Sequence, residues 1–132
     1  MKTIASWSGG KDSTAAIITY LSHGGKIDEA VYCRVMFNDT ISAEHPEHEK
    51  FIYRTAIPKL ESWGIPVKIV QAKINYVGQF MTTFQSGKRE GKIYGFPLRR
   101  GPWCNSQLKV RPLEKYFQSI GEYQNIVGIA YD

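Results

Sequence analysis

The sequence lacks long apolar runs and is poor in cysteine. No stretch of its 132 residues approaches the roughly 20 apolar residues that a membrane helix needs. Cys33 and Cys104 form no CxxC pair, which argues against a disulfide-stapled secreted domain and fits a reducing compartment. Met1-Lys2-Thr3 leads straight into an apolar segment, so no signal sequence is expected. We therefore expect a soluble, cytoplasmic protein with no membrane partner.

Internal repeats and low-complexity tracts are also missing. Apolar residues make up 42% of the chain and aromatic residues 13%, and both values are typical of globular proteins. A chain of this length can bury one core but not two. The sequence therefore predicts a single domain over residues 1–132.

Charge is distributed unevenly along the chain. Residues 88–115 hold eight of the 17 Lys and Arg residues but two of the 12 Asp and Glu residues, so this segment carries a net charge of +6 and the remainder −1. Tyr94, Phe96 and Trp103 are interleaved with these cations. The segment could therefore be a nucleic-acid surface that combines phosphate contacts with stacking, or a plain solvated basic face.

A glycine turn joins the first predicted strand to the first predicted helix. Residues 2–7 (KTIASW) form a short apolar run typical of a buried strand, and residues 13–21 (STAAIITYL) have the apolar period of a helix. The intervening residues 8–13 read SGGKDS. The first amides of a helix have no intrahelical acceptor and carry partial positive charge, so this junction predicts an anion site.

The residue types in the turn suit a polyphosphate. Gly9 and Gly10 allow successive N–H groups to point inward without a Cβ in the way, and Ser8 and Ser13 add hydroxyl donors.

Charged groups complete the turn. Lys11 adds a full positive charge, and Asp12 could hold a magnesium ion that bridges phosphate oxygens. The spacing does not fit a Walker A loop, because Asp12 follows Gly10-Lys11 and Ala5 stands where the first glycine should be.

The rest of the chain alternates predicted strands and helices. Further strands are expected at residues 29–37, 67–71 and 125–130, and further helices at residues 46–63, 75–86 and 105–120, with a kink at Pro58 and a break at Pro112. This order predicts an α/β fold with a parallel sheet, whose ligand crevice lies at the carboxyl ends of the strands. The glycine- and arginine-rich residues 87–101 have no clear period and are interpreted as a functional loop.

The crevice predicts which residues hold a nucleotide. The adenine is expected beside Met36 and Phe37 at the end of the second strand, with Asp39 and Thr40 at the same edge. Cys33, in the middle of that strand, is interpreted as a small core residue.

The basic segment supplies further candidate ligands. We expect Arg99, Arg100 and Lys109 to hold the leaving phosphates or a second anionic group.

The turn SGGKDS resembles the PP-loop (SGGxDS) of the N-type ATP pyrophosphatases and of the phosphoadenosine phosphosulfate reductase family. Three other segments resemble motifs of that reductase family. Residues 37–51 are similar to its "DTG…PE…F" segment, residues 101–112 to its "C…LK…P" segment, and residues 127–132 to its "GI…DE…R" segment.

The resemblance implies a Rossmann-like fold of the adenine nucleotide α-hydrolase (HUP) type, with helices on both faces of the sheet. It implies cleavage or transfer between the α and β phosphates of magnesium ATP, with Lys11 and Asp12 as catalytic residues. An alternative is reduction of phosphoadenosine phosphosulfate by the thiol of Cys104, and another is a domain that binds nucleotide or nucleic acid without catalysis.

The sequence departs from the family pattern in its cysteines and at its C-terminal end. Iron–sulfur members need several paired cysteines, and here Cys104 alone lies in a matching place, so no cluster is expected. The chain ends at Asp132, before the cysteine tail of the sulfonate-reducing members and before the acidic residue and arginine that usually follow. We therefore expect a short or truncated family member that works with an unknown acceptor, as a homo-oligomer or with a partner chain.

Overall fold

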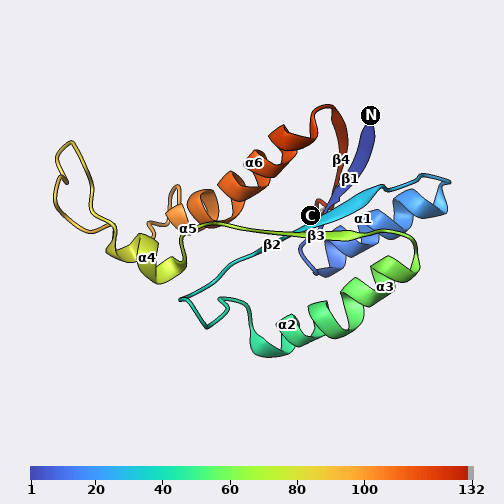
Figure 1. The fold of residues 1–132 in the computed structure, drawn as a ribbon, viewed down its shortest axis with the longest axis horizontal. Coiled ribbons are helices and arrows are strands. Elements are labelled where there is room, and N and C mark those ends of the chain that lie inside the picture. Colours follow the sequence, from blue (N-terminus) through green and yellow to red (C-terminus); the bar gives the residue numbers. More distant parts are fainter. Residues whose placement is uncertain (131–132) are drawn as a thin grey trace.

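A computed structural model of the protein describes residues 1–130, and its centre is a four-stranded parallel sheet (Figure 1). The strands are β1 (Lys2–Ser6), β2 (Glu29–Arg34), β3 (Val67–Gln71) and β4 (Tyr123–Val127). They are arranged in the order β3-β2-β1-β4, and every neighbouring pair is parallel. The predicted α/β class with a parallel sheet is therefore confirmed. Tyr131 and Asp132, the last residues of the family-like segment, lie outside the described part of the chain.

Helices connect these strands. The α-helices are α1 (Lys11–Ser22), α2 (Pro46–Phe51), α3 (Ile57–Ser62), α4 (Tyr76–Met81), α5 (Trp103–Asn105) and α6 (Arg111–Ile120), and the π-helical turns are η1 (Ile52–Ala56) and η2 (Ser106–Val110). In Figure 1, α1, α2 and α3 lie on one side of the sheet and α6 lies on the other.

The two faces of the sheet bury separate apolar clusters, because successive side chains of a strand point to opposite faces. Ala5 of β1 packs with Ile17 of α1 and with Ile52 and Leu60 of the η1–α3 segment. Its neighbour Ile4 faces the other way and packs with Val31, Val70 and Phe117 of α6. Both faces are therefore covered, as is usual for a parallel sheet.

Two strands and one helix differ from their predicted limits. β2 ends at Arg34 rather than at residue 37, because Met36 forms an isolated antiparallel bridge with Ser42 and the chain turns back there. β4 occupies residues 123–127 rather than 125–130. α4 ends at Met81 rather than at residue 86, since Thr82 already has an extended conformation.

Both interior prolines lie just after a π-helical turn. The helix from Pro46 to Ser62 continues through Pro58, and the helix from Trp103 to Ile120 continues through Pro112, so the predicted break at Pro112 is wrong. A proline cannot donate a backbone hydrogen bond, and its ring crowds the carbonyl four residues earlier. In each case the residue before proline donates to the carbonyl five residues back, as in a π-helix. This wider turn accommodates the ring.

Residues 82–95, which follow α4, form an extension that we call the protrusion. A short two-stranded segment closes it, in which the Phe84 amide donates to the Lys92 carbonyl and the Tyr94 amide donates to the Thr82 carbonyl. The rings of Phe84 and Tyr94 stack 4.2 Å apart between their centroids. Figure 1 shows the protrusion projecting away from the sheet.

None of the helices in residues 1–130 combines the length and the apolar character that crossing a bilayer demands.

Candidate functional site

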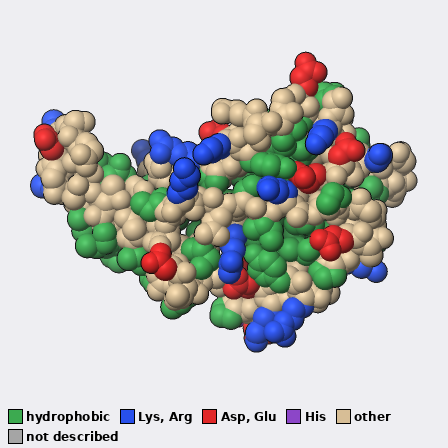
Figure 2. Space-filling view, in the orientation of Figure 1, with side chains coloured by type: hydrophobic (Ala, Val, Ile, Leu, Met, Phe, Trp, Pro, Cys, Tyr) green, Lys and Arg blue, Asp and Glu red, His purple; other side chains and the backbone are tan. Residues whose placement is uncertain are grey.

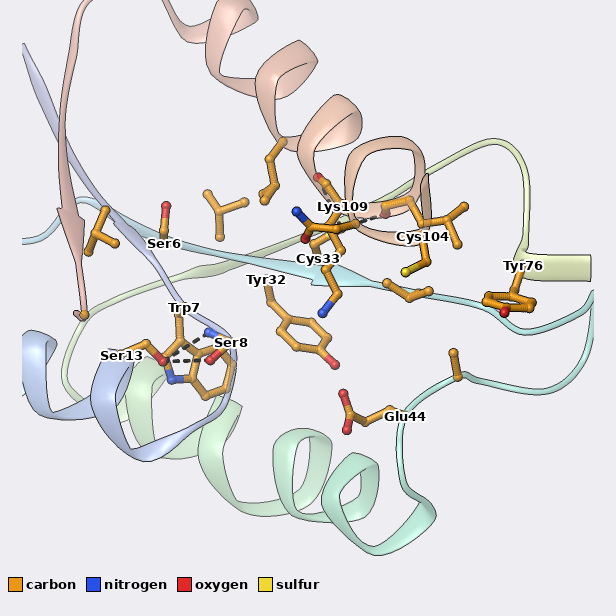
Figure 3. Close-up of a pocket in the computed structure, with 18 residues that line it drawn as sticks. Ser6, Trp7, Ser8, Ser13, Tyr32, Cys33, Glu44, Tyr76, Cys104 and Lys109 are labelled. Carbon is orange, nitrogen blue, oxygen red and sulfur yellow. Dashed lines mark hydrogen bonds between the residues drawn. The ribbon is translucent and has the colours of Figure 1, made fainter. Parts of the chain in front are cut away.

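A cavity of about 530 Å³ opens at the carboxyl ends of β1, β2 and β4 (Figure 3). The chain order reverses between β1 and β4, since β2 and β3 lie on one side of β1 and β4 lies on the other. Ligands of open parallel sheets bind at such a reversal. The cavity volume falls within the range of small-molecule and cofactor sites.

The glycine turn forms one wall of this cavity, and Gly9 fixes its shape. Gly9 has a φ of +79°, which side-chain-bearing residues rarely adopt. A Cβ on Gly9 would also lie 2.8 Å from Cγ1 of Ile52, a fully buried residue of η1. Glycine is therefore required there for two reasons, its backbone conformation and its close contact with the core.

The serines of the turn hydrogen-bond to each other. The hydroxyls of Ser8 and Ser13 lie 3.1 Å apart, and the Ser8 amide donates to Oγ of Ser13 over 3.2 Å. The Gly10 amide donates to Oγ of Ser8. Ser8 and Ser13 both line the cavity, so this network presents two hydroxyls to any bound group.

The start of α1 adds amide donors to the turn. Gly10 is the N-cap, and α1 has no side-chain cap within the described residues. The amides of Lys11, Asp12 and Ser13 therefore lack the acceptor that a capping side chain would supply. Twelve residues of helix align behind them, and the dipole favours negative charge at this end.

The end of β4 closes against this helix start. Gly128, which lines the cavity, lies so near α1 that a Cβ there would overlap the backbone of Asp12 and Ser13. No side chain can be added without moving the turn. The sequence prediction included Gly128 only as part of a family-like segment, and the packing explains why a glycine stands there.

Lys11 and Asp12 lie at the edge of the site. Both side chains are exposed, and neither lines the cavity, although Ser8 and Ser13 of the same turn do. Asp12 instead lines an open cavity of about 560 Å³ between α1 and the end of β4. Nowhere in residues 1–130 do three His, Cys, Asp or Glu side chains gather in a way that could hold a metal ion. Any magnesium ion at Asp12 would need further oxygen ligands from a phosphate group and water.

The opposite wall comes from the helix that begins at Trp103. Cys104, Asn105 and Lys109 line the cavity, and Figure 3 shows Cys104 and Lys109 across from Ser8 and Ser13, with Tyr32 between them. The structure thus brings two predicted site residues of the basic segment together with the glycine turn. Arg99 and Arg100 are exposed and do not line the cavity.

Cys33 lies beneath this wall. Its thiol donates a hydrogen bond to the carbonyl of Leu108 over 3.4 Å. Pro112 is four residues after Leu108 and has no N–H to offer, so the thiol takes the place of the missing helical donor. Burial raises the pKa of the Cys33 thiol to about 11, while the positive charge of Lys109 acts in the opposite direction.

Tyr32 and Glu44 are site residues that the sequence analysis missed. Both line the cavity, and the Tyr32 hydroxyl points toward the Glu44 carboxylate in Figure 3. Burial, and then the negative charge of Glu44, raise the pKa of Tyr32 above its usual value. Tyr32 looked like any aromatic residue of a buried strand, and Glu44 lies in an irregular segment, so neither had a sequence signal.

The predicted adenine residues lie next to the cavity rather than in its wall. Met36 and Asp39 line a separate hollow of about 220 Å³ beside the end of β3. Asn75 donates a hydrogen bond to the Asp39 carboxylate over 2.9 Å. Phe37 stacks on Tyr76, which does line the main cavity.

Thr40 belongs to the turn beside this hollow. It is exposed, and its amide donates to the side chain of Asn38 over 3.0 Å. It contributes to neither the main cavity nor the hollow.

No family model, curated protein or solved structure matches the chain. The function is therefore inferred from the chemistry of the cavity. Lys109 supplies the positive charge and Glu44 the negative charge among the described side chains that line it.

Proposed function

We propose that the chain binds an adenine nucleotide in the main cavity, as a member of the PP-loop superfamily with a fold of the adenine nucleotide α-hydrolase type. One observation carries the proposal. The SGGKDS turn joins β1 to α1 and forms a wall of a cavity at the point where the strand order reverses. Amide donors, a helix dipole and two hydroxyls converge there, and this combination suits phosphate groups.

The two lysines have separate places around the proposed phosphates. Lys11 is exposed at the first turn of α1, and its flexible side chain can reach over the turn. Lys109 lies on the opposite wall. A polyphosphate held between them would be neutralised from both sides.

We propose cleavage or transfer between the α and β phosphates of ATP as the reaction. An acceptor attacks the α-phosphorus and pyrophosphate leaves, so the protein mainly has to position the reactants and neutralise charge. The turn amides, Lys11 and Lys109 perform these tasks. Magnesium binds phosphate oxygens together with one or two carboxylates and water, and Asp12 fits that role. Glu44 and Tyr32, which line the cavity beside the proposed phosphates, would contact the acceptor.

Reduction of phosphoadenosine phosphosulfate is the second candidate, and the position of Cys104 favours it. The Cys104 thiolate would attack the sulfonate sulfur, and the sulfur–oxygen bond would break to release the nucleoside bisphosphate. A thiol reductant would then attack the sulfur of Cys104, forming a mixed disulfide and releasing sulfite. Lys109 in the same wall would neutralise the negative charge of the bound nucleotide. A nucleotide-binding domain without catalysis is the third candidate.

Binding is tested with Lys11→Ala. A hydrogen bond to a charged group contributes roughly 1.5–3 kcal/mol, so the variant should bind ATP at least about tenfold more weakly. Isothermal titration of the nucleotide measures this change. Unchanged affinity for ATP would show that the glycine turn is not part of the nucleotide site.

The reaction is tested by separate incubations with magnesium ATP and with phosphoadenosine phosphosulfate plus a thiol reductant. Pyrophosphate release in the first incubation is the expected result. Sulfite release in the second, lost in Cys104→Ser, would replace the proposed reaction by the second candidate. Nucleotide binding without either product would favour the third candidate, a domain that binds nucleotide without catalysis.

A further inference from the structure

A second concavity, far from the glycine turn, lies between β3 and α6. It is a groove of about 700 Å³ lined by residues 68–74 on the strand side and by residues of the segment 107–119 on the helix side. β3 is an edge strand, so this side of the sheet is open. The groove shares no lining residue with the main cavity.

The groove is strongly basic. Four cations line it, Lys68 and Lys73 from the strand side and Arg111 and Lys115 from α6, and no Asp or Glu is among the lining residues that the structure describes. All four are exposed. None of them has a carboxylate within 4.0 Å in residues 1–130. Figure 2 shows Lys and Arg side chains gathered over the start of α6 and along the boundary with β3.

The helix side presents its polar groups as a stripe. Gln107, Arg111, Lys115 and Ser119 recur every four residues, a spacing that puts them on one face of the helix. Twelve residues of helix rise about 18 Å, so the stripe is long and narrow. A row of donors along an open groove suits an extended polyanion better than a compact anion.

We propose that this groove binds single-stranded nucleic acid through its phosphodiester backbone. Lys68, Lys73, Arg111 and Lys115 contact successive phosphates. The side-chain amide of Gln107, whose oxygen accepts a hydrogen bond from Arg111, donates between them. Two of these lysines lie outside the basic segment 88–115, so the groove is a product of the fold. The inference does not depend on the proposed nucleotide chemistry.

The narrow shape of the groove favours a single strand, and its aromatic content indicates contact with the backbone rather than with the bases. The one aromatic ring in its lining, that of Tyr116, lies under the Lys68 ammonium at 5.6 Å, and its hydroxyl donates a hydrogen bond to Glu29. That ring is therefore not free to stack on a base. One backbone can follow such a groove with all four cations within its reach.

Salt dependence gives the first test. Four phosphate contacts on a single strand predict a slope of about −2.8 for log K against log salt concentration, so affinity should fall about 50-fold between 50 and 200 mM salt. Fluorescence anisotropy of a labelled oligothymidylate measures this slope, and an oligouridylate of the same length compares RNA with DNA. A slope near zero would overturn the proposal.

Variants locate the binding. Arg111→Gln with Lys115→Gln should weaken oligothymidylate binding at least tenfold and reduce the slope by about 1.4. Arg111→Lys with Lys115→Arg keeps both charges and should bind like the wild type. Lys26→Gln with Lys59→Gln removes the same charge from the surface outside the groove and should have less than a twofold effect. Thermal melting followed by circular dichroism checks that each variant is folded. Ser119→Glu adds a negative charge at an exposed position of the groove and should also weaken oligothymidylate binding.

Several results would reject the groove. Equal losses in the Lys26/Lys59 pair would mean that net charge alone attracts the oligonucleotide. A loss confined to Lys88→Gln with Lys92→Gln would move the binding to the protrusion. A duplex of the same length that competes as well as the single strand would overturn the claim for single strands.

Discussion

The glycine turn at residues 8–13 and the protrusion at residues 82–95 both contain glycines with positive φ beside basic residues, yet they differ in how the fold holds them. In the turn, a Cβ on Gly9 would meet buried Ile52. In the protrusion, Gly87 and Gly91 also have positive φ, but a Cβ on either would meet nothing within 4 Å. A glycine pattern therefore identifies a binding turn only when the core packs against it.

The largest expected effect that sharpens this comparison is at Gly9. Gly9→Ala forces a side chain into the left-handed region, at roughly 1–2 kcal/mol, and overlaps Ile52, at roughly 1–3 kcal/mol. We expect the free energy of unfolding to fall by about 2–5 kcal/mol in urea denaturation. Gly87→Ala is the matched control, because it has the unfavourable backbone conformation without an overlap with another side chain. Equal losses in the two variants would show that the turn is no better packed than the protrusion.

Nucleotide affinity gives the second test, within the basic segment itself. Lys109→Ala removes a cation from the cavity wall and should weaken ATP binding roughly ten- to hundredfold. Arg100→Ala removes an exposed cation outside the cavity and should change the affinity by less than about twofold. Titration calorimetry at low salt measures both. A comparable loss of ATP affinity in Arg100→Ala would show that the exposed arginines also belong to the nucleotide site.

The third prediction concerns the wall beneath Lys109 and its pH dependence. The pKa of Cys33 rises from about 9 to about 11 in the folded protein, so the fold favours the protonated thiol. The resulting stability is fully present below pH 9 and is lost as pH rises toward 11. We expect denaturant midpoints to fall over this range, and to fall less in Cys33→Ala.

Alkylation provides a second readout of the same thiol. Thiolates are the reactive form, so Cys33 should resist iodoacetamide at pH 8, and peptide mapping should find Cys104 labelled first. Rapid labelling of Cys33 would contradict its burial.

The smallest effect is expected from the protrusion. Residues 85–91 extend beyond the hydrogen bond that joins the Phe84 amide to the Lys92 carbonyl, so an Asn-Gly turn can replace them. Because the removed residues are exposed, unfolding free energy should change by less than about 1 kcal/mol. ATP affinity should be unchanged. A loss of affinity would mean that the protrusion reaches the nucleotide.

Local patterns predicted much of the fold and one side of the site. β1, β3, α1 and the strand–turn–helix junction follow from short-range apolar periods and from glycine, and the structure has them within one or two residues. Pro112 misled the prediction, because a π-helical turn that absorbs a proline leaves no signal in the apolar period.

The opposite wall could be predicted only in part. Charge placed Arg99, Arg100 and Lys109 together in the sequence, but it cannot say which of them points inward. Tyr32 and Glu44 enter the cavity because β2 and the irregular chain after it meet there in space. Such convergence depends on tertiary packing, and no pattern within either segment encodes it.

The π-helical turn η2 sets the rotational phase between the two ends of one helical rod. An α-helix turns about 100° per residue, and a π turn holds one residue more than the α-helix would. Deleting one residue from Ser106–Val110 would therefore restore an α-helical turn and leave Cys104 and Phe117 on their present sides of the axis, but it would return the ring of Pro112 to the crowding that the π turn relieves. Residues of both sites lie on this helix, since Lys109 lines the cavity and Arg111 lines the basic groove, so a distortion of η2 would disturb the two sites together.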